Sequence, residues 1–393
     1  MIIYFSIIIS FGIGAFLEVF LVEKNEKKKL KLIFYIFMLF LLLFFGFRGY
    51  VATDWVSYSQ FYKEIEPISE VISGSGTNFK SLSIELGFKL YMSFLKMFSS
   101  NYNFFVFFNS AIDLYILYMI TKKWTKYRVL MLFSYFAFTG TFLHFDILRN
   151  AKSIMLFILS IKYLKTRNFS KYFIVNLIGA FFHISALLYL PLYFLLNKKI
   201  SKKKLIISFI VLNLIYFFNL IDLKKILPLF DCFYSDYVKN KLDIYLSDQH
   251  YGAVSKISIQ VIEKNMFLIY LIKYYEKLSN KNKDNIIYMN LLFLLIVIFM
   301  VSRSFFIISD RVMINIMFTY WFIIPMIMKN IRKISNKLLF LFLICVYCFR
   351  LFVVPRYNPD EKSKERLRYD NILFNHKSYE ERMKNIILIR SLN

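Results

Sequence analysis

Charged side chains and one imidazole interrupt the apolar segment from Phe145 to Phe194 of this 393-residue chain, which a basic link at Lys165 to Lys171 divides into two runs. Arg149 and Lys152 open its first apolar run, and His183 lies in the middle of its second. A charged group at hydrocarbon depth costs about 3 kcal/mol or more, so such groups face a polar cavity or a partner and not lipid. Arg149 and His183 are therefore the first candidates for a functional site.

Four polar clusters are expected on the outer side of a membrane, given the topology described below. They are Arg48 with Asp54, Arg149 near His144 and Asp146, His183, and Arg303 with Asp310 and Arg311. Arginines bind phosphate oxygens bidentately, and a carboxylate or a neutral imidazole accepts a proton from a sugar hydroxyl. If the clusters converge, they suit transfer of a glycan from a lipid pyrophosphate, which needs a base for the attacking hydroxyl and positive charge for the departing diphosphate.

Each candidate also has a structural interpretation, and the sequence leaves both open. Interfacial anchoring suits the basic residues next to apolar runs, which are Arg48, Arg149 and Lys152. Structural ion pairs suit Arg48 with Asp54 and Asp310 with Arg311. A structural hydrogen bond suits His183. Aromatic residues of the outer loops suit either stacking on sugar rings or anchoring at the interface, and they include Trp55, Tyr58, Tyr234 and Tyr237.

Composition predicts an all-α polytopic membrane protein. Hydrophobic residues make up 58% of the chain, and the mean hydropathy is +0.53. Apolar runs such as Leu32 to Phe47 and Ile286 to Val301 approach the ~20 residues that cross a bilayer core. The net charge of +26 arises mainly from short basic links between such runs. This distribution is an orientation signal, so nucleic acid is not an expected partner and membrane lipids are.

Cysteines and short motifs predict no metal or nucleotide site. Three Cys cannot build a disulfide framework, and the pair Cys345 and Cys348 lies in an apolar run without a second pair or a nearby His. The chain has no HExxH, P-loop or GxSxG motif in a suitable context. We therefore expect no cofactor and a metal-independent reaction.

Basic links set the predicted topology. The link from Glu23 to Lys31 contains five Lys and is cytoplasmic by the positive-inside rule, which places the N-terminus outside. Continued alternation gives about 10–12 membrane helices. We expect one membrane domain over residues 1–355, with outer loops 48–100 and 221–255, and a charged outer tail over 356–393. Within the first loop, Ser83 to Phe98 has the pattern of an amphipathic interfacial helix.

The segment 172–197 fits either one membrane crossing or a short hairpin of two half-helices. Basic links on both of its sides look cytoplasmic, and only about 26 residues separate them, at ~1.5 Å per helical residue. We favour a hairpin that bends near His183, because this choice keeps every later basic link inside. Irregular backbone at this depth would have to line a cavity.

Several short motifs resemble those of bacterial EpsG-like and Wzy-type polysaccharide polymerases. They are FRGYVATDWVSYSQFY from Phe47, LRNAKSIMLFILSIKYL from Leu148, GAFFHISALLYLPLYF from Gly179 and SDRVMINIMFTYW from Ser309. Their order and spacing agree across most of the chain. Ala52 departs from the family pattern, because it stands where Gly precedes Thr-Asp, and the Gln or Asn after the arginine is Asn150 here.

The resemblance implies a membrane polymerase of O-antigen, capsule or exopolysaccharide with a plan like that of GT-C glycosyltransferases. Such enzymes join undecaprenyl-pyrophosphate-linked oligosaccharide units at the outer face of the bacterial inner or plasma membrane, with the site toward the periplasm or exterior. Donor and acceptor glycans are the implied partners, with a chain-length regulator and a flippase as further ones. The implied pyrophosphate-binding residues are Arg48, Arg149 and Arg311, the implied catalytic residues are Asp54 and His183, and additional candidates are Lys152, Arg303, Asp310, Tyr58 and His144.

Two other functions stay open at this stage. A glycan ligase of related plan would make a single transfer, and a transporter would move the lipid-linked unit across the membrane. A transporter would more often show paired repeats and Gly- or Pro-broken helices in both halves, which the sequence lacks. The sequence leaves both Asp54 and His183 open as the base.

Overall fold

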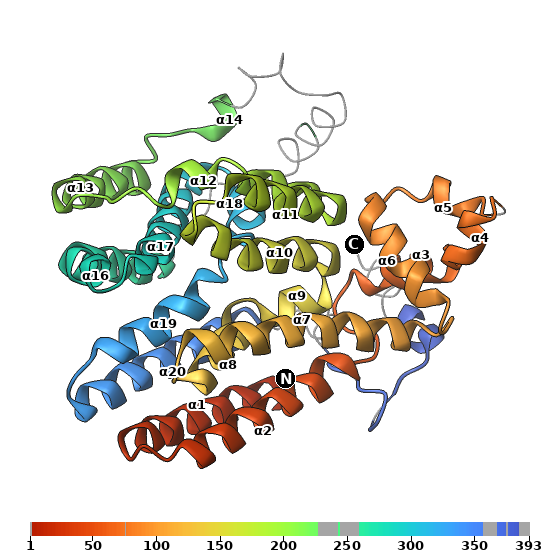
Figure 1. The fold of residues 1–393 in the computed structure, drawn as a ribbon, viewed down its shortest axis with the longest axis horizontal. Coiled ribbons are helices and arrows are strands. Elements are labelled where there is room, and N and C mark those ends of the chain that lie inside the picture. The colour runs from red at the N-terminus through yellow and green to blue at the C-terminus, as the bar shows by residue number, and fades with distance from the viewer. Residues whose placement is uncertain are drawn as a thin grey trace. The chain divides into compact units, whose positions relative to one another are not determined.

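The computed structural model describes residues 2–74, 76–226, 243, 259–356, 368–374 and 376–384 (Figure 1). Over these residues the named elements are all helices, which confirms the predicted all-α class. Six helical spans are long and apolar enough to cross a membrane, so the chain is a multi-pass membrane protein. They are Ile3–Glu23, Lys27–Gly46, Tyr102–Trp124, Arg128–Phe145, Asp284–Ser304 and Ile334–Leu351. The larger count of 10–12 stays a prediction.

The described residues form two compact units. Unit 1 comprises Met1–Ile161, Ser170–Leu190 and Tyr320–Asn393, and unit 2 comprises Lys162–Phe169 and Pro191–Thr319. Each unit is described by itself below. Among the predicted candidates, only Arg303, Asp310 and Arg311 belong to unit 2.

Membrane helices of unit 1 pack around α1 (Ile2–Glu23), which contacts α2 (Lys27–Gly46), α8 (Arg128–Tyr135) and α20 (Ile334–Arg356). Its one deeply buried acid, Glu18, accepts hydrogen bonds from the backbone N–H groups of Val129 and Leu130 at 2.7 and 3.0 Å. These N–H groups lie at the start of α8, where no helical carbonyl is available to them. Glu18 therefore caps one membrane helix from another. Unit 1 also contains α7 (Tyr102–Trp124), η1 (Phe136–Gly140), α9 (Thr141–Phe145), most of α10 (Leu148–Lys165) and most of α19 (Thr319–Asn330).

A layer of short helices lies between α2 and α7 in sequence, drawn in orange in Figure 1. It contains α3 (Trp55–Glu64), α4 (Ile68–Ile72), α5 (Asn78–Ser81) and α6 (Leu86–Lys96). Aromatic and aliphatic side chains of α3, α6 and α7 form its core, including Tyr62, Phe88 and Phe105. The predicted amphipathic helix is thus confirmed as α6, which buries one face on α3 and α7.

The chain bends at His183, as predicted. Helix α11 (Phe169–Phe182) ends one residue earlier, His183 is extended at φ −159° and ψ 129°, and a 3₁₀ helix, η2 (Ile184–Tyr189), follows. The hydroxyl of Tyr172, near the start of α11, donates to the carbonyl oxygen of Tyr189 at 2.5 Å. The ends of the two segments therefore meet, as the predicted hairpin requires, and its place in the membrane stays a prediction. The short α12 (Leu192–Leu195) comes next.

Unit 2 contains α13 (Lys202–Phe218), α14 (Leu223–Ile226), α16 (Gln260–Lys281), α17 (Asp284–Val301), η4 (Ser302–Ser304) and α18 (Phe306–Met313). The side chain of Asn290 on α17 donates to the carbonyl oxygens of Leu196 and Lys198, both at 2.8 Å, and accepts from the hydroxyl of Tyr275 at 2.7 Å. This buried amide thereby ties α16 and α17 to the link that follows α12. Most of the predicted outer loop 221–255, including Tyr234 and Tyr237, lies outside the described residues.

The described part of the C-terminal segment belongs to unit 1 and packs next to the end of α2. Residues Phe47 to Gly49 pair with it in one isolated antiparallel bridge, in which Arg48 lies opposite Asn371. Tyr369 stacks on Phe44 with ring centroids 4.4 Å apart and an interplanar angle of 6°. The segment therefore contributes to the fold next to the end of α2.

Candidate functional site

Arg149 on α10 forms an ion pair with Glu85, the residue before α6. Its Nη1 lies 2.5 Å from Oε2 of Glu85, and the two side chains are 28% and 22% exposed. The hydroxyl of Tyr58 on α3 also interacts with the guanidinium. Two residues after Glu85, Gly87 lets α6 approach α11 closely, because a Cβ atom there would lie 2.8 Å from the carbonyl oxygen of Phe181. Arg149 is thus a half-buried cation whose carboxylate partner an anionic ligand could replace.

His183 is connected to α10 through Ser185 and Asn150. Nδ1 of His183 lies 2.8 Å from Oγ of Ser185, and this Oγ donates to Oδ1 of Asn150 at 2.8 Å. Ser153 approaches the same Oδ1 at 2.9 Å from the next turn of α10. Asn150 directly follows Arg149 in α10. The same turn of α10 therefore carries the predicted cation and, through Ser185, is connected to the predicted imidazole of His183.

Asp146 holds the segment that contains Asp54. One oxygen of Asp146 accepts from the backbone N–H and hydroxyl of Thr53 at 3.1 and 3.2 Å and from the N–H of Asp54 at 3.3 Å. These groups lie at the start of α3, where a carboxylate also meets the positive end of the helix dipole. Ala52 precedes them at φ +70°, a left-handed conformation. Asp54 itself is exposed, as a base for an external hydroxyl must be.

Arg48 is fully buried, so it is not an interfacial anchor. Its Nη1 donates to the carbonyl oxygen of Gly49 at 3.3 Å, and its guanidinium lies over the ring of Phe145 at 5.6 Å. Nε and Nη2 have no hydrogen-bond partner among the described residues. The C-terminal bridge at Asn371 lies beside it. Arg48 can therefore contact a ligand only after its surroundings move.

Lys152 is paired in the interior and is not an interfacial anchor. Its Nζ lies 2.7 Å from Oδ1 of Asp113 on α7 and donates to the carbonyl oxygen of Asn109 at 2.9 Å. The two side chains are 7% and 0% exposed. This pair joins α7 to α10 and places no charge where a substrate could reach it.

His144 is likewise buried. Its Nε2 forms a hydrogen bond with the hydroxyl of Tyr135, and its ring stacks on Phe45 with centroids 4.1 Å apart. These contacts support a packing role within unit 1.

The three candidates of unit 2 differ in exposure. Nη1 of Arg303 donates to the carbonyl oxygens of Tyr216 and Phe217 in the last turn of α13. Arg303 therefore binds the end of a helix, where carbonyl groups lack helical partners. Asp310 and Arg311 lie exposed on α18. Their convergence with Arg149 and His183 stays a prediction.

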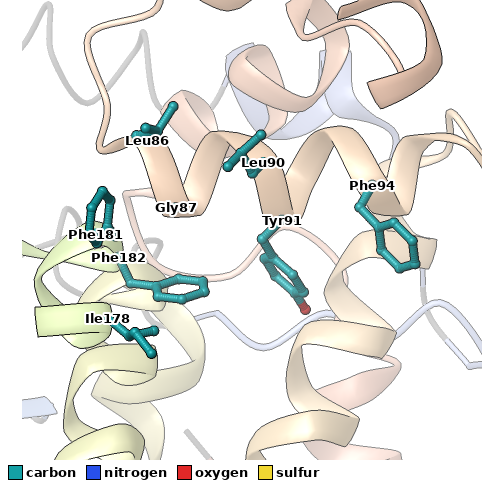
Figure 2. A pocket seen from close by; sticks show the side chains of 8 residues that line it. All are labelled: Leu86, Gly87, Leu90, Tyr91, Phe94, Ile178, Phe181 and Phe182. Atoms are coloured by element: carbon teal, nitrogen blue, oxygen red, sulfur yellow. The ribbon is translucent and has the colours of Figure 1, made fainter. Parts of the chain in front are cut away.

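An apolar groove of about 440 Å³ runs between α6 and α11 (Figure 2). Its lining is Leu86, Gly87, Leu90, Tyr91, Phe94, Ile178, Phe181 and Phe182. Glu85 directly precedes Leu86, and His183 directly follows Phe182. The groove can hold an apolar chain. Of the polar residues next to it in sequence, Glu85 contacts Arg149, and His183 contacts Ser185, which donates to Asn150.

Sequence reasoning missed the partners of the candidates. Glu85 was assigned only to an amphipathic helix, and Asp113 was not singled out within its apolar run. Acidic residues inside or beside apolar runs are the signal that could have found both, since buried cations need partners. In the part of the chain that the structure describes, no three His, Cys, Asp or Glu side chains gather into a possible metal site.

Residues 31–371 match the family model described as the EpsG family. No curated protein and no solved structure matches the chain.

Proposed function

The chain belongs to the EpsG family, and we propose that it polymerises undecaprenyl-pyrophosphate-linked oligosaccharide units at the outer face of the bacterial plasma or inner membrane. Membership indicates a polysaccharide polymerase in general. The lipid-linked substrate, the metal-independent glycosyl transfer and the GT-C-like plan are parts of the proposal. The product is a surface polysaccharide such as O-antigen, capsule or exopolysaccharide.

The observation that carries the proposal is that one turn of α10 connects to both a cation and an imidazole. Arg149 supplies a cation beside Glu85, and Asn150 holds Ser185, which contacts His183. Transfer from a lipid diphosphate needs a positive group for the leaving phosphate and a base for the attacking hydroxyl. The cation is Arg149 itself, and the base, His183, is connected to the next residue, Asn150, through Ser185.

In the proposed reaction, the oxygen of an acceptor sugar hydroxyl attacks the anomeric carbon of the donor. The bond from that carbon to the diphosphate oxygen breaks, and its electron pair leaves with the diphosphate. Arg149, with Arg48 after rearrangement, binds the diphosphate, and His183 or Asp54 accepts the hydroxyl proton. Arg311 stays a sequence-based candidate for diphosphate binding. We propose that the displacement inverts the anomeric centre.

Donor lipid is accommodated, in this proposal, by the groove between α6 and α11. Its lining is apolar, as a polyprenyl chain requires, and in sequence Glu85 directly precedes one lining residue and His183 directly follows another. A diphosphate that binds Arg149 displaces the carboxylate of Glu85, because both anions need the same guanidinium donors.

A cellular experiment tests this function. Deletion of the gene should leave single lipid-linked repeat units on the outer leaflet. Arg149→Ala should not restore polymer, Arg149→Lys should restore little, and the matched control Lys123→Ala, at an exposed cation of α7, should restore it fully. Units trapped on the cytoplasmic leaflet would indicate a transporter, and polymer of normal length that stays unattached would indicate a ligase.

A further inference from the structure

The hydrogen bonds around His183 determine which of its ring nitrogens carries the proton. We propose that Ser185 and Asn150 are positioning residues that hold neutral His183 as the Nδ1–H tautomer, so that its unprotonated Nε2 accepts the proton of the acceptor hydroxyl. This inference rests on the proposed function and selects His183 over Asp54 as the base.

A count of hydrogen atoms supports the assignment. The Ser185 hydroxyl has one hydrogen, and its Oγ lies 2.8 Å from both Oδ1 of Asn150 and Nδ1 of His183. An amide oxygen carries no hydrogen, so the contact with Asn150 uses the serine hydrogen. The contact with His183 must then use a hydrogen on Nδ1. With Nδ1 protonated, a neutral imidazole has its lone pair on Nε2.

A longer contact favours the opposite tautomer. The backbone N–H of Ser185 points at Nδ1 of His183 across 3.3 Å, which would require Nδ1 to accept. If Nδ1 accepts, the Ser185 hydroxyl must also donate its hydrogen to Nδ1. Oγ of Ser185 and Oδ1 of Asn150 would then face each other as two acceptors without a hydrogen between them. The Nδ1–H tautomer gives up only the 3.3 Å contact, whereas the opposite tautomer gives up the 2.8 Å contact between Ser185 and Asn150. The first loss is smaller, because hydrogen bonds weaken at the longer distance.

Local packing holds the hydrogen-bonded chain from Asn150 through Ser185 to His183, called the relay below, in one position. Gly179 lies close to both Ala186 and Ser153, since a Cβ atom there would meet the Ala186 methyl at 3.2 Å. Asn176 on α11 donates to Oγ of Ser160 on α10 at 3.0 Å. These contacts fix α11 and η2 against α10, so Ser185 faces Asn150 in a defined position. The relay therefore orients the ring as well as its proton.

The tautomer matters during transfer. As the acceptor oxygen bonds to the anomeric carbon, its proton moves to Nε2, and the diphosphate leaves with the electron pair of the broken bond. The resulting imidazolium still donates from Nδ1 to Ser185, which stabilises its charge. Deprotonation by water then restores the starting tautomer.

The direct test is the protonation state of His183 in the full chain. Selective ¹⁵N-histidine labelling at about pH 8, above the ordinary histidine pKa, gives the coupling pattern of each ring nitrogen, and His183→Gln identifies the signal. We expect protonated Nδ1 and unprotonated Nε2 in the native protein. Ser185→Ala should shift the population toward Nε2–H, and Ser185→Thr, which keeps the hydroxyl, should not.

Kinetic measurements separate positioning from simple structural support. Ser185→Ala should lower kcat for polymerisation about tenfold with little change in KM, because the base loses its tautomer control while substrate binding persists. Ser185→Thr should restore the rate. Asn150→Asp, which keeps an acceptor oxygen toward Ser185, should preserve the native tautomer.

The outcomes are distinguishable. A native Nε2–H signal overturns the inference even if His183→Gln abolishes polymerisation, and this result needs no variant of Ser185 to fold. A native Nδ1–H signal in a protein that makes no polymer overturns the proposed function and, with it, the role of Nε2. Retention of polymerisation by His183→Gln would also overturn the inference and would transfer the role of base to Asp54.

Discussion

Lys152 and Asp113 form an ion pair inside unit 1, with Nζ and Oδ1 2.7 Å apart and both side chains almost fully buried. They lie 39 positions apart in sequence and link α10 to α7. A buried pair of this kind contributes little net stability, but loss of one partner leaves an uncompensated charge. The pair thereby fixes α10, the helix that holds Arg149 and Asn150.

Removal of one partner should therefore cost more than removal of both. Asp113→Leu should destabilise the protein by about 3 kcal/mol or more, whereas Asp113→Leu with Lys152→Met should cost much less. Thermal unfolding in detergent measures both variants against the native chain. Equal losses in the single and double variants would show that the charges are not coupled.

Glu85 should compete with the donor for Arg149. Glu85→Gln removes the carboxylate charge and keeps a similar shape, so we expect KM for the lipid-linked donor to fall about fivefold, on the scale of a partly exposed ion pair. The kcat value should change little. Glu70→Gln, at an acid of the same helical layer in α4, is the matched control. A fall in kcat and unchanged KM would contradict competition and indicate that the pair only supports the fold.

Ala52 should be strained where glycine would not be. Its φ of +70° lies in the left-handed region, which costs a residue with a Cβ about 1–2 kcal/mol. Ala52→Gly should stabilise unit 1 by about 1 kcal/mol after the larger unfolded-state entropy of glycine is included. Ala137→Gly, at a buried helical position, should destabilise it. Destabilisation by both substitutions would contradict the assigned backbone conformation.

Glu66 should make the stability of the outer helical layer depend on pH. Burial raises the pKa of its carboxyl group, but the N–H groups of Asn78 and Phe79, at 2.8 and 2.9 Å, outweigh burial and lower it below the ordinary 4.5. A lowered pKa in the folded state contributes stability that is present above the unfolded-state pKa and is lost as pH falls through the folded-state pKa. Stability should thus hold above pH 4.5 and fall below it.

Comparison with Glu66→Gln checks this dependence. The amide cannot ionise, so the variant should be less stable than the native protein near neutral pH and should lose part of the decline on acidification. Thermal unfolding over a pH series measures both. A native decline that the variant reproduces in full would assign the pH dependence to other groups.

Apolar runs and basic links predicted the helices and the bend at His183, because membrane crossing constrains length and charge locally. They did not predict the partners of the candidate residues. Arg149 and Glu85 are 64 positions apart, and Ser185 and Asn150 are 35 apart. Such pairs depend on which helices pack together, and the composition of an apolar run does not indicate its neighbours. The burial of Arg48 beside Asn371 was hidden for the same reason.

Reconstitution of the reaction tests the central claim most directly. The purified protein would receive a lipid-pyrophosphate-linked repeat unit from its own strain, without nucleotide sugar or metal, and the products would be separated on a gel. We predict a ladder of polymer that Arg149→Ala abolishes and Lys123→Ala preserves. A folded native protein that leaves authentic substrate as single units, or an Arg149→Ala variant that gives a normal ladder, would contradict the account.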